Sequence, residues 1–129
     1  MNPAWGTDLT LKIGPHSIKA TIANTPPSRE KGLMQTKYLC KNCGMLFVFP
    51  EPGKHSFWMK NTSLPLSIAF ISREGHILNI EEMQALSAHL HTAQSNALYA
   101  LEMNKGWFAM HEIKPDTKVL GLKQVPTGE

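Results

Sequence analysis

The chain has 129 residues, 42% of them hydrophobic and 18% charged, a composition typical of a single globular domain. Its formal net charge is +3 and its lysines are scattered, which argues against a nucleic-acid partner, because such a partner needs clustered basic residues. No apolar run approaches the roughly 18 residues of a membrane-spanning helix, so we expect no membrane span in this chain.

The N-terminal region predicts a β-hairpin. Apolar and polar residues alternate over 9–13 and again over 17–23, which is the pattern of strands with one buried face. Gly14-Pro15 between the two segments is typical of a turn, so the strands should pair with each other.

A short helix should follow the hairpin. Thr25 and Pro26 are typical of a helix start, because the threonine hydroxyl caps the first turn and proline needs no N–H partner there. Gly32 suits the left-handed position just past a helix. We therefore expect a helix of one or two turns over 26–31, carrying Arg29.

The centre of the chain predicts the most buried strands. Residues 45–49 are all apolar and are bounded by glycine and proline, and so short a run favours a central strand over a helix. Residues 50–53 predict a turn because they read Pro-Glu-Pro-Gly. Further strands are expected over 55–60 and 66–71.

The C-terminal half predicts three more strands, over 76–80, 97–103 and 118–122, the last of them closing the sheet. Residues 84–96 are small and polar and predict a long loop with room for one helical turn. Loops of that length in small domains often have functional roles. A short helix is expected within 104–111.

These elements predict a mainly β fold. About eight short strands, without repeated strand–helix units, favour a mostly antiparallel sheet of barrel-like or sandwich form. We expect one domain over residues 9–122, an N-terminal extension over 1–8 and a C-terminal tail over 123–129.

One cluster of residues predicts a ligand site. Trp58, Lys60, Asn61 and Thr62 combine an aromatic platform, a cation and hydrogen-bonding groups, with Trp58 and Lys60 on one face of the expected strand. Such a set suits a small polar, anionic or carbohydrate-like ligand. The alternative is that Asn61 and Thr62 only cap a turn while Lys60 is solvated.

Glu102 is the second candidate, because it interrupts an otherwise apolar strand. A buried carboxylate needs a partner or its pKa rises, and Arg29 and Lys60 are candidate partners. Glu102 could instead point outward at a sheet edge, and a pair with Arg29 could be purely structural.

The cysteines and histidines support no metal or cofactor. Cys40 and Cys43 form a CxxC motif, but no second cysteine pair completes a zinc site, and a strand pattern follows where a thioredoxin-like site has a helix. A local disulfide fits if the protein is exported. His89 and His91, with the methionines, raise the possibility of copper, yet methionine mainly fills gaps in cores. No catalytic motif occurs, and whether the chain is an enzyme stays open.

Three motifs occur in order along the chain. They are Arg29 with Gly32-Leu33-Met34, the run GMLFVF from Gly44 to Phe49, and WMKNT from Trp58 to Thr62 followed by Pro65-Leu66. Glu102 in a late strand, followed by Gly106, also fits the same pattern. Together these residues resemble the family catalogued as Domain of Unknown Function 192, over roughly residues 9–122.

The resemblance implies a small, mostly β domain, often exported in bacteria behind a signal peptide or lipid anchor, and it implies no established activity. One departure is that Ser67 stands where the family pattern usually has aspartate. If that acid served as a base or metal ligand, this chain would lack the chemistry, so Ser67 favours binding or a structural role over catalysis.

The sequence and the resemblance together favour an exported binding module of the periplasm or cell envelope. Its pocket would bring together Arg29, Trp58, Lys60, Asn61, Thr62 and Glu102, with the 84–96 loop near the mouth. One alternative is a hydrolase or transferase that uses Glu102 as acid or base. Another is a structural or protein-interaction domain, which would have no concave pocket at Trp58 and Lys60.

Overall fold

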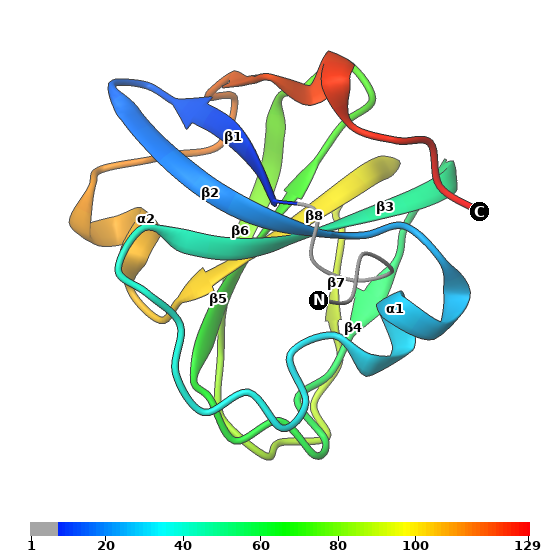
Figure 1. Cartoon of the computed structure of the whole chain (residues 1–129), viewed down its shortest axis with the longest axis vertical. Coiled ribbons are helices and arrows are strands. Elements are labelled where there is room, and N and C mark those ends of the chain that lie inside the picture. The colour runs from blue at the N-terminus through cyan, green and yellow to red at the C-terminus, as the bar shows by residue number, and fades with distance from the viewer. Residues whose placement is uncertain (1–7) are drawn as a thin grey trace.

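A curled sheet of seven strands forms the body of the computed structural model, which describes residues 8–129 (Figure 1). In spatial order the strands are β6 (Ile77–Met83), β5 (Leu66–Ile71), β8 (Ala97–Asn104), β3 (Cys43–Gly53), β2 (His16–Ala23), β1 (Asp8–Ile13) and β9 (Val119–Leu120). The remaining elements are a ribbon of β4 (Ser56–Phe57) and β7 (His91–Thr92), the helices α1 (Pro26–Lys31) and α2 (Trp107–Met110), and the 3-10 helix η1 (Leu122–Gln124). The predicted mainly β class is confirmed.

The sheet is mostly antiparallel, as predicted, with one parallel pair. β2 and β3 run parallel because α1 and the loop after it carry the chain back across between them. The two ends of the sheet also meet. His76 and Lys118 form an isolated bridge, and the Val119 N–H donates to the Gly75 carbonyl over 2.8 Å. These contacts give the sheet its barrel-like form.

Local sequence accounts for α1. The Ser28 N–H donates to Thr25 Oγ1 over 3.2 Å, and the Thr25 N–H donates to Ser28 Oγ over 3.0 Å, which makes a capping box. Gly32 ends the helix with a φ of 50°, a conformation that favours glycine. The predicted helix over 26–31 is confirmed.

The predicted turn over 50–53 is wrong. β3 continues through this segment to Gly53, and its register against β8 shifts between Val48 and Gly53. Pro50 and Pro52 have no N–H to donate to a regular ladder, so the strand becomes irregular here without reversing.

The predicted strand over 55–60 is too long, because only Ser56–Phe57 pairs, and its partner is β7. Beyond Phe57 the backbone bonds to the 84–96 loop: the Met59 N–H donates to the Ser87 carbonyl over 3.0 Å. That loop contains β7 and no helical turn.

The sheet buries a different core on each face. The barrel face includes Leu46, Leu101 and Met103, which pack with Trp107 and Phe108 of the α2 region. The opposite face, here called the pocket face, includes Phe47, Ile68, Phe70 and Ala100, covered by Leu33 and Met59. Strand alternation places Glu102 on the pocket face, since its cross-strand partners are Met45 and Ile68.

A Cys40–Cys43 disulfide closes the loop that leads into β3, with the two Cα atoms 5.0 Å apart. Asn104 Nδ2 donates to the Leu39 carbonyl over 2.9 Å, and Trp107 Nε1 donates to Asn42 Oδ1 over 3.1 Å. The loop is therefore attached to the corner between β8 and α2.

The expected extension over 1–8 lies outside the described residues, apart from Asp8, which begins β1. The expected tail over 123–129 packs on the body of the domain. The Glu129 N–H donates to the Asn24 carbonyl over 2.7 Å, and Asn24 Nδ2 donates to the Thr127 carbonyl over 3.0 Å. Among residues 8–129, no helix is long and apolar enough to cross a membrane.

Candidate functional site

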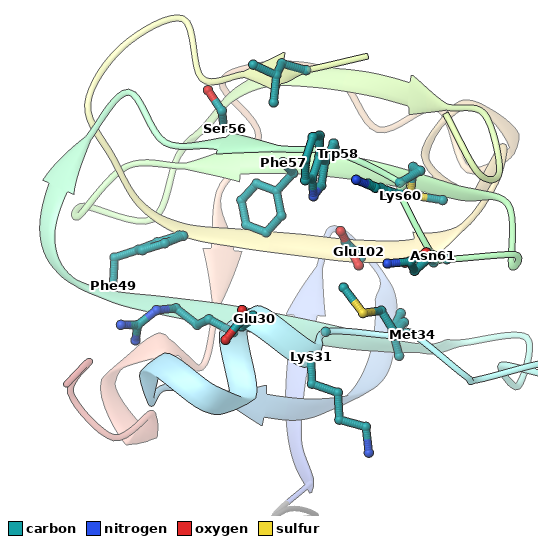
Figure 2. A pocket seen from close by; sticks show the side chains of 16 residues that line it. Glu30, Lys31, Met34, Phe49, Ser56, Phe57, Trp58, Lys60, Asn61 and Glu102 are labelled. Atoms are coloured by element: carbon teal, nitrogen blue, oxygen red, sulfur yellow. The ribbon is translucent and has the colours of Figure 1, made fainter. Parts of the chain in front are cut away.

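A pocket of about 610 Å³ opens on the pocket face of the sheet, between α1 and the segment 56–62 (Figure 2). All six residues expected at a site from the sequence line it: Arg29, Trp58, Lys60, Asn61, Thr62 and Glu102. The rest of the lining comprises Glu30, Lys31, Gly32, Leu33, Met34, Phe49, Ser56, Phe57, Met59 and Leu90. A concave pocket at Trp58 and Lys60 is the feature that a purely structural domain was expected to lack.

The 84–96 loop holds one wall of this pocket in place. The Leu86 N–H donates to the Thr62 carbonyl over 2.9 Å, so the loop and the 59–62 turn are joined by main-chain hydrogen bonds. Ser56 Oγ and Thr92 Oγ1 lie 2.7 Å apart across the β4–β7 ribbon. Leu90 of the loop lines the pocket, as expected for a loop near its mouth.

Trp58 and Lys60 form the outer part of that wall. Lys60 Nζ lies 5.3 Å from the centroid of the Trp58 ring, within the range of a cation–π interaction. Trp58 is 47% exposed, so it is a platform at the mouth and not part of the core. Phe57 and Met59 also line the pocket, because the strand that would point them away ends at Phe57.

Glu102 lies at the floor. Figure 2 shows its carboxyl group between the Trp58–Lys60 wall and Met34. β8 is a central strand and Glu102 is only 5% exposed, so the sheet-edge alternative is wrong. Among residues 8–129, no side chain or backbone group pairs with this carboxyl, and burial raises the pKa of Glu102 to about 8.

Arg29 does not pair with Glu102, contrary to the hypothesis of such a pair. Its guanidinium donates to the Val48 carbonyl over 2.9 Å and to the Glu129 carbonyl over 2.6 Å, and lies 5.4 Å from the Phe49 ring centroid. Lys60, the other expected partner, lies over Trp58 instead. Two main-chain carbonyls and an aromatic ring therefore fix Arg29 at one end of the pocket.

Asn61 and Thr62 make the turn at the end of this wall. Asn61 has a φ of 66°, in the left-handed region that asparagine tolerates, and the Thr62 N–H donates to the Met59 carbonyl over 2.9 Å. The turn is thus closed by the backbone. Neither side chain takes part in the hydrogen bonds found within residues 8–129, so the side-chain capping alternative is not what the structure shows.

Ser67 lies away from the pocket. Its cross-strand partner is Met103, which places Ser67 on the barrel face. Ser67 Oγ donates to Glu82 Oε1 and accepts a 2.8 Å hydrogen bond from the Gly106 N–H. The departure from the family's aspartate therefore leaves the pocket unchanged, and Glu82 supplies a carboxylate at this corner.

The apolar part of the site was not predicted from the sequence. Leu33 and Met34 line the pocket, as do the rings of Phe49 and Phe57. The family motif that joins Arg29 to Gly32-Leu33-Met34 was the available signal, because it places Leu33 and Met34 directly after the helix that carries Arg29.

The histidine pair makes a different contact. His91 Nδ1 lies 3.1 Å from Glu81 Oε1, and the His89 and His91 ring centroids are 4.8 Å apart. Within the described part of the chain, no group of three or more His, Cys, Asp or Glu side chains is arranged to hold a metal ion.

Comparison with known proteins identifies the family. The sequence profile of Domain of Unknown Function 192, a family described as "Uncharacterized ACR", matches residues 9–121. The chain belongs to this family. No curated protein matches the chain.

Two solved structures share the fold of this family member. A protein from Sinorhizobium meliloti, described as a candidate transcription regulator, is 32% identical with a TM-score of 0.82, over 87% of this chain and 90% of that one. A protein of unknown function from Novosphingobium aromaticivorans is 30% identical with a TM-score of 0.85, over 88% of this chain and 85% of that one.

Proposed function

We propose that this protein is a binding module for a small polar ligand, anionic or carbohydrate-like, which occupies the pocket in front of Glu102. The observation that carries the proposal is the unpaired carboxyl at the pocket floor. A buried polar group without a partner costs free energy, and a ligand group that pairs with it would recover that cost.

The walls suit such a ligand. Trp58 offers a half-exposed aromatic face on which a ring can stack, and Lys60 beside it offers a cation for an anionic group. Pockets with apolar walls and a few convergent polar groups are the usual form of small-molecule sites. We propose no nucleic-acid partner for this protein, although one structural neighbour is described as a candidate transcription regulator.

The proposal places the protein in the periplasm or cell envelope. Its support is the Cys40–Cys43 disulfide, because disulfides persist in oxidising compartments and are rare in the cytosol. Alkylating the thiols of fractionated cells before reduction tests this location: both cysteines should be protected in the envelope fraction, and free cysteines in a cytosolic fraction would contradict it.

Native mass spectrometry of protein purified gently from its host tests the binding function. We expect a small molecule to copurify with the wild type and to be lost from Trp58→Ala, with the melting temperature nearly unchanged because Trp58 is half exposed. Tyr38→Ala, which removes a 79% exposed ring elsewhere, is the matched control and should keep the ligand. A large loss of stability with the ligand retained would show that Trp58 is structural.

An enzymatic role is the second candidate, and the protonation state of Glu102 favours it. A carboxyl whose pKa is raised to about 8 is still protonated at neutral pH, which is the state that a general acid needs. Turnover of any substrate should then fail in Glu102→Gln, and full turnover in that variant would remove this candidate.

A further inference from the structure

We infer that the ligand is a small zwitterion whose ammonium group meets Glu102 while its anionic group faces the mouth of the pocket. This inference rests on the proposed binding function and names the class of ligand. It starts from Glu102, a residue that is 5% exposed and whose carboxyl faces the cavity and is unpaired within residues 8–129.

The cations that line the pocket are placed where they do not neutralise Glu102. Arg29 is bonded to the Val48 and Glu129 carbonyls, and Lys60 lies over the Trp58 ring. Lys31 also lines the pocket, but Figure 2 shows its side chain directed away from Glu102. A positive charge beside the carboxyl therefore has to come from the ligand.

The surroundings of the carboxyl suit an ammonium ion better than a row of hydroxyls. The aromatic rings of Phe57 and Trp58 line the same cavity, and aromatic faces attract cations. The cross-strand neighbours of Glu102 are Met45 and Ile68, which offer no hydrogen bonds. Asn61 and Thr62 also line the pocket with side chains that make no hydrogen bond within residues 8–129, but two such groups would leave most hydroxyls of a polyhydroxy group unpaired.

The mouth of the pocket, unlike its floor, favours an anionic group. α1 contributes Arg29, Glu30 and Lys31 to the lining, and the opposite wall contributes Lys60. Arg29 and Lys60, set against the one exposed carboxylate of Glu30, favour an anionic group at this end. A bare amine would meet net repulsion on entry, whereas a zwitterion satisfies both ends.

Binding should therefore displace the Glu102 proton. Below pH 8 the empty pocket holds a neutral carboxyl, and an arriving ammonium ion favours the carboxylate. We expect release of about one proton per ligand near pH 7, and an affinity that rises about tenfold per pH unit from pH 5.5 to 7.5.

Titration calorimetry with two matched pairs of probes tests this inference. The pairs are glucosamine 6-phosphate with glucose 6-phosphate, and phenylalanine with 3-phenyllactate; within each pair an ammonium group is exchanged for a hydroxyl. In at least one pair the amine should bind at least tenfold more tightly at pH 7.5. Measurements in phosphate and in Tris give the number of protons released.

Two variants complete the test. Glu102→Gln should abolish the advantage of the amine and the proton release, while Glu74→Gln, which alters an exposed carboxylate outside the pocket lining, should keep both. Equal or tighter binding of the hydroxyl probes would overturn the ammonium assignment while leaving the binding function intact. Failure of all four probes would also overturn the assignment, because the binding function is judged separately by the copurified ligand.

Discussion

At the scale of single residues, Glu102 is the feature on which the account depends. A carboxyl on a central strand, between Met45 and Ile68, loses its hydration without gaining a partner among the described residues. Such a group is costly when charged, so it stays protonated and makes the folded state sensitive to pH.

The stability of the protein should therefore fall as the pH rises. The pKa of Glu102 is raised from 4.5 to about 8, so between these values the folded state holds a proton that the unfolded state has lost. This contribution is complete below pH 4.5 and is lost as the pH approaches 8, with a slope of up to about 1.4 kcal/mol per pH unit.

Glu102→Gln should remove that slope. Urea unfolding at pH 5, 6.5 and 8 gives the free energy of unfolding of both proteins. The value for the variant should rise relative to that of the wild type as the pH rises, and should be the larger of the two at pH 8. Glu30→Gln should follow the wild type, because Glu30 is exposed. If the free energy of unfolding depended on pH in the same way in the wild type and in Glu102→Gln, Glu102 would be solvated in solution.

At the scale of elements, the pocket depends on two segments that approach β8. Gly44, the second residue of β3, lies at a point where any side chain would collide with the Glu102 carbonyl oxygen and the Met103 sulfur, so glycine allows the strands to pack here. α1 supplies the other wall, and its first turn is fixed by the Thr25–Ser28 capping box.

Loss of the cap should weaken both stability and binding. Thr25→Ala removes the acceptor of the Ser28 N–H and should lower the free energy of unfolding by about 1 kcal/mol. Because α1 carries Arg29, Glu30 and Lys31 into the pocket, affinity for the copurified ligand should fall as well. Thr25→Ser keeps the hydroxyl and should retain the stability and the affinity of the wild type. If Thr25→Ala had the same stability and affinity as the wild type, the cap would not support the site.

At the scale of the whole molecule, the C-terminal segment connects distant parts of the chain. It runs beside the end of β3 (Figure 1), where Gly128 lies so close to the Phe49 and Pro50 backbone that no side chain fits. Arg29 joins this segment to the pocket through its hydrogen bond to the Glu129 carbonyl.

Gly128→Val should displace this segment. The variant should lose the Glu129-to-Asn24 and Arg29-to-Glu129 hydrogen bonds, for a destabilisation of about 2 kcal/mol. Hydrogen exchange at the Glu129 amide should become fast, whereas Thr127→Ala, which leaves the Thr127 carbonyl in place, should retain slow exchange. Slow exchange in Gly128→Val would mean that the segment does not pack in this way.

Much of this organisation could be predicted from local sequence. Alternation over 9–13 and over 17–23, the Thr25-Pro26 cap and the apolar run 45–49 each specify their own element, and all four elements are observed. The grouping of the six site residues around one pocket was predicted from the family motifs and from Glu102, the carboxylate that interrupts an apolar strand.

The predictions that were wrong concern features that depend on contacts between distant segments. The partners assigned to Glu102 were wrong because Arg29 is bonded to Val48 and to the C-terminal segment, about which its own neighbours in sequence say nothing. The turn expected over 50–53 failed because pairing with β8 outweighs the local preference of two prolines. Ser67 was used as an argument about the chemistry of the site, but it lies on the other face of the sheet, because the face of its strand is set by register.

Measurement of the Glu102 carboxyl pKa by carbon-13 NMR, without and with the copurified ligand, shows whether this carboxyl is buried and unpaired until a ligand binds. We expect a pKa near 8 in the empty pocket and a lower pKa with ligand bound, because the ligand supplies the missing positive charge. A pKa near 4.5 in the empty protein, unchanged by ligand, would contradict the unpaired carboxyl on which the proposed binding function rests.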